Sequence, residues 1–183
     1  MTSQNEGPNE TVIELKNLTK IFGPRPQKML THLQNGCTTK EIREKTGHVV
    51  ALRNISFSVK KGEIFVLMGL SGCGKSTLLR CLNRLIEPTT GSIFIDGEDI
   101  TSLSIDRMRS IRRKRMGMVF QSFALLPHRN VLDNIAFGLE IQGIPYDERI
   151  SQAKETLNLV GLSGYESSYP DQLSGGMQQR VGL

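Results

Sequence analysis

The sequence has 183 residues, of which 38% are hydrophobic and 22% charged, and its formal net charge is +5. This length suits one domain that buries a core without disulfides or metals, and no apolar run approaches the roughly 18 residues of a membrane-spanning helix. The first residues are polar and lack the apolar core of a secretory signal, so we expect residues 1–11 to form a polar tail and the chain to stay in the cytosol.

Three cysteines, Cys37, Cys73 and Cys81, show no paired CxxC spacing and no neighbouring histidines. This pattern argues against a zinc site and a disulfide framework, and we expect free thiols. Much of the positive charge lies in RMRSIRRKRM, residues 107–116. Such a run is usually a solvated helix face, although it also suits a nucleic-acid ligand.

The N-terminal third predicts two strands separated by two short helices. TVIELKNLTKIF (11–22) alternates as a strand and ends at a Gly-Pro pair. PQKMLTHLQNG (26–36) has apolar residues at helical spacing, and TTKEIREKTG (38–47) opens with the capping-box pair Thr38 and Glu41.

Next come an alternating strand and a continuous apolar one. Ile55, Phe57 and Val59 alternate strictly, which predicts a half-exposed strand. After a Lys-Lys-Gly turn, the unbroken apolar run 64–68 predicts a buried strand of the parallel type.

The remaining elements follow from periodicity and from turn residues. Leucines at helical spacing predict a helix over 78–85, SIFIDG (92–97) predicts a strand or hairpin, and MGMVFQ (116–121) predicts a short buried strand. From Asn130 the pattern is helical, with two breaks, and either Ser174 or Asp171 is the predicted cap of the last helix.

The stretch GLSGCGKS, residues 69–76, has two glycines at the phosphate-loop spacing, followed by a lysine and a hydroxyl residue. Glycines allow backbone angles that bare several N–H groups, and with a helix N-terminus these groups attract phosphate. Lys75 supplies a charge for the β- and γ-phosphates, and the Ser76 hydroxyl can bind Mg²⁺. The alternative is a strand-to-helix turn that merely needs glycine. The predicted nucleotide-binding residues here are Gly69, Ser71, Gly72, Cys73, Gly74, Lys75, Ser76 and Thr77.

A second motif, LSGGMQQRV (173–181), narrows the interpretation. Together with the phosphate loop and with Gln121 after MVF, it resembles the nucleotide-binding subunit of an ABC transporter. The resemblance implies that this segment opens a helix and meets the γ-phosphate held by a partner subunit. The residues assigned to this contact are Ser174, Gly175, Gly176 and Gln178. The alternative is an ordinary glycine-rich helix start.

The resemblance assigns further roles by position. Phe22 matches the aromatic that stacks on adenine, although an aromatic at a strand end is more often core. Gln121 matches the catalytic residue that senses Mg²⁺ and the attacking water, so Ser76 and Gln121 are the implied metal ligands. Residues 122–134 are expected to line the groove that docks on the membrane subunit, and His128 receives no catalytic role.

The likeness is closer still to the ATP-binding subunits of glycine betaine/proline importers. The segment of residues 24–48, which is longer than in most ABC ATPases, carries this likeness together with MGLSGCGKSTLLRCLNRLIEPTTG and FQSFALLPHRNVLDNIAFGLE. Met177 stands where ABC proteins most often have glutamine, a departure that the betaine branch shares. The implied layout is an ABC nucleotide-binding domain over 12–183, a helical insertion at about 24–48 and a helical subdomain at about 122–173.

The fold class implied is α/β, a P-loop NTPase with an antiparallel β portion and a helical subdomain. The expected function is Mg-ATP hydrolysis that powers osmoprotectant import at the cytoplasmic face of the membrane. The expected partners are a second copy in a head-to-tail dimer, a transmembrane permease and, indirectly, an extracytoplasmic solute-binding protein. No nucleic-acid partner is expected.

One departure from the family concerns the C-terminal part. The family continues into an acidic strand with a Mg²⁺ aspartate and a glutamate base, followed by a switch histidine, and none of these precedes Leu183. We therefore expect the first part of a longer subunit, one that binds nucleotide without turnover by itself. Two alternatives stay open: a binding-only fragment, and a soluble ABC ATPase that acts on nucleic acid.

Overall fold

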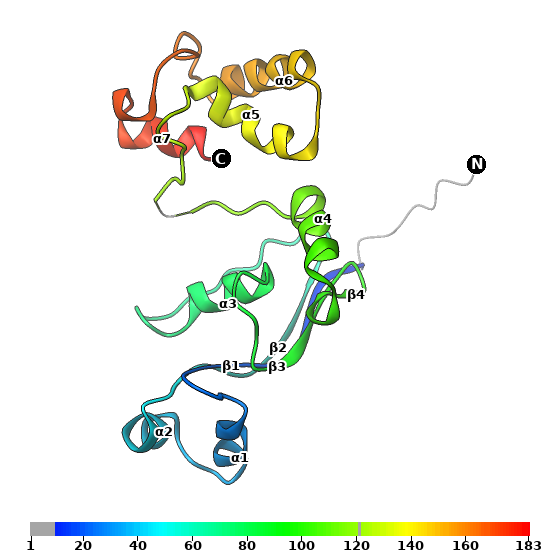
Figure 1. The fold of residues 1–183 in the computed structure, drawn as a ribbon, viewed down its shortest axis with the longest axis vertical. Coiled ribbons are helices and arrows are strands. Elements are labelled where there is room, and N and C mark those ends of the chain that lie inside the picture. Colours follow the sequence, from blue (N-terminus) through cyan, green and yellow to red (C-terminus); the bar gives the residue numbers. More distant parts are fainter. Residues whose placement is uncertain (1–9, 121) are drawn as a thin grey trace, which may run out of the picture. The chain divides into compact units, whose positions relative to one another are not determined.

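The computed structural model describes residues 10–120 and 122–183, and the chain divides into two compact units, Met1–Met108 and Arg109–Leu183 (Figure 1). Each unit has a hydrophobic core of its own. Among the described residues, no helix combines the length and the apolar character needed to cross a membrane.

The first unit is built on an antiparallel sheet, which has four strands among the described residues, in the order β2-β1-β3-β4. The strands are β1 (Thr11–Phe22), β2 (Val49–Lys60), β3 (Thr90–Ile95) and β4 (Glu98–Asp99). β1 lies in the middle and buries Leu15, Leu18 and Ile21. The predicted strand over 11–22, the alternating strand and the predicted hairpin are confirmed.

The turn between β3 and β4 is Asp96-Gly97. Both residues have positive φ, 48° and 77°, which is the backbone of a type I′ hairpin turn and favours Asp-Gly. The chain then forms a 3₁₀ turn (Ile100–Ser102) and the helix α4 (Ile105–Arg115). The basic run is therefore helical, and its Arg107 binds Glu98 with an Nε–Oε1 distance of 3.0 Å.

The insertion between β1 and β2 consists of α1 (Lys28–Gln34) and α2 (Thr39–Thr46), which lie together beyond one end of the strands (Figure 1). The predicted capping box is present: Glu41 N donates to Thr38 Oγ1 at 3.2 Å, and Thr38 N donates to Glu41 Oε2 at 2.7 Å. The two helices pack on the end of β1 through a small core of Ile21, Met29, Leu33 and Ile42. The prediction of two short helices is confirmed.

Two sequence predictions of buried strands are wrong. Residues 64–68 form no strand, and Ile64 and Met68 are 90% and 89% exposed. Residues 116–120 likewise form no strand, and Val119 is 55% exposed. A strand needs a hydrogen-bonded neighbour, and no described strand pairs with either segment. The segment 64–68 does contact β2, because the Phe65 ring stacks on Phe57 with ring centroids 4.5 Å apart.

The second unit is helical, as the sequence predicts from Asn130 onward. After the last part of α4, which crosses the boundary between the units, its elements are α5 (Val131–Gln142), α6 (Tyr146–Leu159), a 3₁₀ turn (Pro170–Gln172) and α7 (Gly175–Val181). Asn130 caps α5 by accepting from Asp133 N at 2.8 Å, and Gly143 ends it in the left-handed conformation. The core of this unit contains Val131, Leu157, Leu162, Leu173 and Val181.

Candidate nucleotide-binding site

The phosphate-loop residues lie directly before and in the first turn of α3 (Lys75–Leu82). Gly74 is the N-cap at φ 98°, and no side chain accepts a hydrogen bond from the first turn. A Cβ at Gly74 would stand 2.5 Å from the carbonyl oxygen of Ala51 in β2. The loop therefore rests directly on β2, and only glycine permits that approach.

Lys75 folds back over its own loop. Its Nζ donates to Gly69 O at 2.7 Å and Leu70 O at 2.8 Å, and it lies 3.5 Å from Cys73 Sγ. These contacts use the donors of an ammonium group, which has three hydrogens and no lone pair. A phosphate could therefore bind Lys75 only if its oxygens took the place of Gly69 O and Leu70 O as acceptors of the Lys75 hydrogen bonds.

The start of α3 is anchored by its buried face. Leu78 and Cys81 are buried, and burial raises the pKa of the Cys81 thiol, with Lys20 opposing this effect. The uncharged thiol thus acts as a small apolar side chain in the core. By contrast, Ser71 and Gly72 of the loop and Ser76 of the first helical turn are exposed to solvent. The Ser76 hydroxyl offers a hard oxygen ligand beside the loop, which fits Mg²⁺.

Phe22 lies at the end of β1 and pairs with Val49 of β2. Its side chain is 39% exposed, and Lys20 Nζ stands 4.9 Å from the ring centroid. Lys20 also donates to Glu87 O at 2.8 Å, which fixes the ammonium. Val49 is two residues from Ala51, the residue under Gly74, so Phe22 and the loop meet β2 about 7 Å apart along the strand.

The signature residues lie in the second unit, at the start of α7. Ser174 is the N-cap, and its Oγ accepts from Met177 N at 3.4 Å, so the prediction of Ser174 as the cap is confirmed. Gly175 and Gly176 are exposed in the first turn. Gln178 differs, because its Nε2 donates to Pro170 O at 2.7 Å and to Leu173 O at 3.3 Å. Its amide therefore fixes the preceding turn.

The structure brings together some of the predicted site residues. Phe22 and the phosphate loop belong to the first unit, and the signature residues belong to the second. Gln121, the predicted catalytic residue and metal ligand, lies outside the described residues.

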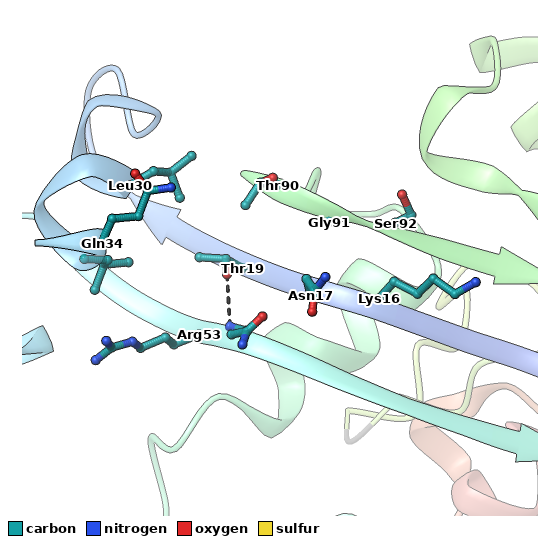
Figure 2. Close-up of a pocket in the computed structure, with 11 residues that line it drawn as sticks. Lys16, Asn17, Thr19, Leu30, Gln34, Arg53, Thr90, Gly91 and Ser92 are labelled. Carbon is teal, nitrogen blue, oxygen red and sulfur yellow. Dashed lines mark hydrogen bonds between the residues drawn. The ribbon is translucent and has the colours of Figure 1, made fainter. Parts of the chain in front are cut away.

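Sequence reasoning did not predict a pocket of about 740 Å³ on the first unit (Figure 2). It spans three strands and α1, and it is lined by Lys16, Asn17, Thr19, Leu30, Leu33, Gln34, Arg53, Asn54, Thr90, Gly91 and Ser92. Asn17 and Asn54 both have φ near 50°, and Asn54 N donates to Thr19 Oγ1 at 3.0 Å. The lining has two cations and no acidic side chain, and no phosphate-loop residue contributes to it.

Comparison with known proteins decides the family. The family model described as ABC transporter matches residues 52–183, which include the phosphate loop and the signature segment. The chain belongs to the ABC transporter family. The glycine betaine transport ATP-binding protein OpuAA of Bacillus subtilis is 57% identical over 93% of this chain and 41% of its own length. The glycine betaine/proline betaine transport ATP-binding protein ProV of Escherichia coli is 54% identical over 93% of this chain and 43% of its own length.

Solved structures agree with this ABC assignment. A dimeric bacterial ABC transporter cassette has a TM-score of 0.76 at 33% identity, covering 93% of this chain and 67% of that one. A dimeric post-hydrolysis ATP-binding cassette bound to ADP and Pi has a TM-score of 0.75 at 33% identity, covering 93% and 66%. The fold is therefore that of an ABC nucleotide-binding domain, of which this chain spans about two thirds, and it spans about two fifths of the curated relatives.

Proposed function

We propose that the subunit that carries this sequence hydrolyses Mg-ATP to power the import of glycine betaine/proline-type osmoprotectants. The observation that carries the proposal is the 57% identity to a glycine betaine transport ATP-binding protein across 93% of the chain. A soluble ABC ATPase that acts on nucleic acid is not favoured, because the relatives at 53–57% identity are glycine betaine transport proteins.

The proposed chemistry begins at the phosphate loop. The uncapped first turn of α3 and the glycine backbone bind the β- and γ-phosphates, and Lys75 exchanges Gly69 O and Leu70 O for phosphate oxygens. Ser76 would hold Mg²⁺, which would supply positive charge against the charge that develops on the γ-phosphate. Adenine stacks on Phe22, which Lys20 contacts from one side. Gln121 is proposed to orient the attacking water.

The proposed dimer is head-to-tail, and the exposed start of α7 meets the nucleotide held by the second copy. Ser174, Gly175 and Gly176 offer a hydroxyl and bare backbone to a γ-phosphate. We assign Gln178 to support of this segment, because its amide already binds two carbonyls. The structural neighbours are dimeric cassettes, which supports a dimer as the working form.

The proposed contact with the permease is the segment 122–134. Phe123, Leu125 and Leu126 line a pocket of about 530 Å³ in the second unit. Asn134 shapes this loop, accepting from Leu126 N at 2.7 Å and donating to Leu126 O at 3.1 Å. Docking there would place the subunit at the cytoplasmic face of the membrane. Cysteine crosslinking across 122–134 in the assembled transporter tests the contact, and crosslinks found only elsewhere would refute it.

The layout proposed for the subunit is a nucleotide-binding domain over 12–183 with its insertion at about 24–48 and its helical subdomain at about 122–173. The decisive experiment measures uptake of labelled glycine betaine and proline into vesicles that carry the assembled transporter. We expect uptake of at least one labelled solute that requires ATP on the cytoplasmic side, and we expect this uptake to be lost in the Lys75→Ala variant. ATP-independent uptake, or none with either solute, would overturn the proposed function.

A further inference from the structure

A buried histidine stands at the junction of the insertion and β2. His48 is only 6% exposed, and it is one of two buried polar residues among those described, the other being Thr19. Its ring nitrogens are both in hydrogen-bond contact: Nε2 lies 2.8 Å from Pro24 O, and Nδ1 lies 3.1 Å from Thr46 O and 3.0 Å from Thr46 Oγ1. The proposed function assigns no role to this residue.

The imidazole connects the two ends of the insertion. A carbonyl oxygen can only accept a hydrogen bond, so Nε2 carries a proton and donates it to Pro24 O. Pro24 lies just after β1, whereas Thr46 is the last residue of α2 and lies just before β2. One side chain therefore holds both places where the insertion leaves the sheet.

The same ring determines the path of the chain after Phe22. Gly23 has φ 135°, and a Cβ there would overlap the Cδ2 atom of His48. The backbone leaving β1 thus lies directly on the imidazole, and this packing requires glycine on geometric grounds.

The backbone of Phe22 is consequently held by two residues, one that follows His48 in the chain and one that packs on its ring. Its strand partner is Val49, the residue that follows His48, and its next neighbour is Gly23, which packs on the ring. Lys20 contacts the aromatic ring itself at 4.9 Å. The backbone of Phe22 therefore has little freedom as long as the three contacts of His48 remain.

We propose that His48 is a positioning residue for nucleotide binding: it clamps the two ends of the insertion and thereby holds Phe22 in place to stack on the nucleotide base. This inference rests on the proposed function, because it needs ATP at the phosphate loop and its base at Phe22. It requires no contact between His48 and the nucleotide. The effect of His48 should therefore appear in binding of the base and not in binding of the phosphates.

The test is calorimetry of Mg-ATP and of Mg-tripolyphosphate with the subunit that carries this sequence. His48→Phe keeps an aromatic ring but loses the hydrogen bond to Pro24 O and the polar contacts of Nδ1 with Thr46. His32→Phe is the matched control on the exposed side of α1. We expect His48→Phe to weaken ATP binding about three- to tenfold, as partial loss of base stacking predicts, and to leave tripolyphosphate binding unchanged. Phe22→Leu should show the same pattern, and its effect should not add to that of His48→Phe.

His48→Gln provides a second variant, since its amide can still donate to Pro24 O, and we expect it to recover at least half of the lost ATP affinity. If His48→Phe does not fold, the remaining loss in His48→Gln carries the test: ATP binding should still weaken, and tripolyphosphate binding should not. Equal weakening of both ligands, unchanged ATP binding in every His48 variant that folds, or additivity with Phe22→Leu would overturn the inference. Failure of the parent subunit to bind ATP and tripolyphosphate would instead overturn the proposed function.

Discussion

Two helices of this chain begin at glycine-rich segments, and their first turns are satisfied in different ways. At α3 the N-cap is Gly74, which has no side chain to accept from the first N–H groups. At α7 the Ser174 hydroxyl accepts from Met177 N, and Gln178 secures the turn before it. The start of α3 therefore leaves its orphan donors to solvent or to a ligand, whereas the start of α7 satisfies one of them internally.

This difference indicates how each segment would meet a nucleotide. An uncapped helix start next to a lysine attracts an anion, because its N–H groups and its partial positive charge have no competing side chain. A capped start has one of its donors satisfied before any ligand arrives and offers what remains exposed, here Ser174, Gly175 and Gly176. The first segment suits tight binding of phosphate, and the second suits a weaker contact that depends on a partner.

The largest expected effect is on the lysine at the uncapped start. Lys75→Ala should weaken Mg-ATP binding about 10- to 150-fold, the equivalent of a charge-assisted contact worth roughly 1.5–3 kcal/mol. Calorimetry measures this, with Arg80→Ala as the control because Arg80 is an exposed cation in the same helix. Equal ATP affinity in the Lys75 variant and the parent would show that the loop is not the nucleotide site.

The next effect compares the glycines of the two segments. Gly74→Ala forces a side chain into positive φ and against Ala51 O, so the free energy of unfolding should fall by about 1–3 kcal/mol. A Cβ at Gly176, in α7, has no neighbour within 4 Å, so Gly176→Ala should raise the free energy of unfolding by at most about 1 kcal/mol. Urea unfolding of both variants measures the two changes. A similar loss of unfolding free energy in both variants would contradict the expected difference between the two glycine-rich segments.

A smaller effect is expected at the cap of α7. Ser174→Ala should lower the free energy of unfolding by about 1 kcal/mol, because Met177 N loses its acceptor. Hydrogen exchange at the Met177 amide should become faster, while ATP binding to the single subunit stays unchanged. Ser174→Asp keeps an acceptor at the same place and should retain the stability. A loss as large in the aspartate variant would show that the hydroxyl does not act as a cap.

The smallest effect concerns α2, the most completely capped start. The Thr38 backbone N–H, followed by its hydroxyl, lowers the pKa of Glu41 from its ordinary value of 4.5. A carboxylate with a lowered pKa contributes its full stabilisation above pH 4.5. This contribution is lost as the pH falls through the lower pKa of the folded state. The difference in Tm between the parent and Glu41→Gln should therefore be largest at pH 7 and shrink as the pH falls below 4.5. A constant difference over this range would exclude the carboxylate as the cause.

The elements that the sequence predicted correctly depend on short-range signals. Thr38 and Glu41 are three residues apart, Asp96-Gly97 is one dipeptide, and the alternation of Ile55, Phe57 and Val59 lies within one strand. Ser174 could be predicted as a cap for the same reason. In each case the residues that make the structure are neighbours in the chain, so their pattern is readable without a partner.

The errors and omissions depend on distant contacts. An apolar run such as 64–68 becomes a strand only where another strand pairs with it, and periodicity does not supply that partner. The Gln178 amide binds Pro170 O, and the imidazole of His48 binds Pro24 O, through turns that bring the residues together. The 740 Å³ pocket likewise combines three strands with α1, so the pattern of no single segment predicts it.

The insertion also bears on how the sheet assembles. β1 and β2 pair from Phe22 and Val49 onward, so everything from residue 23 to residue 48 forms the connection of one antiparallel hairpin. A flexible connection of that length costs roughly 1.5–2 kcal/mol more closure entropy than a four-residue turn. The two helices fold this connection into a compact unit that packs on Ile21, which shortens the free length of chain between the strands. The long connection should therefore slow strand pairing far less than its number of residues suggests.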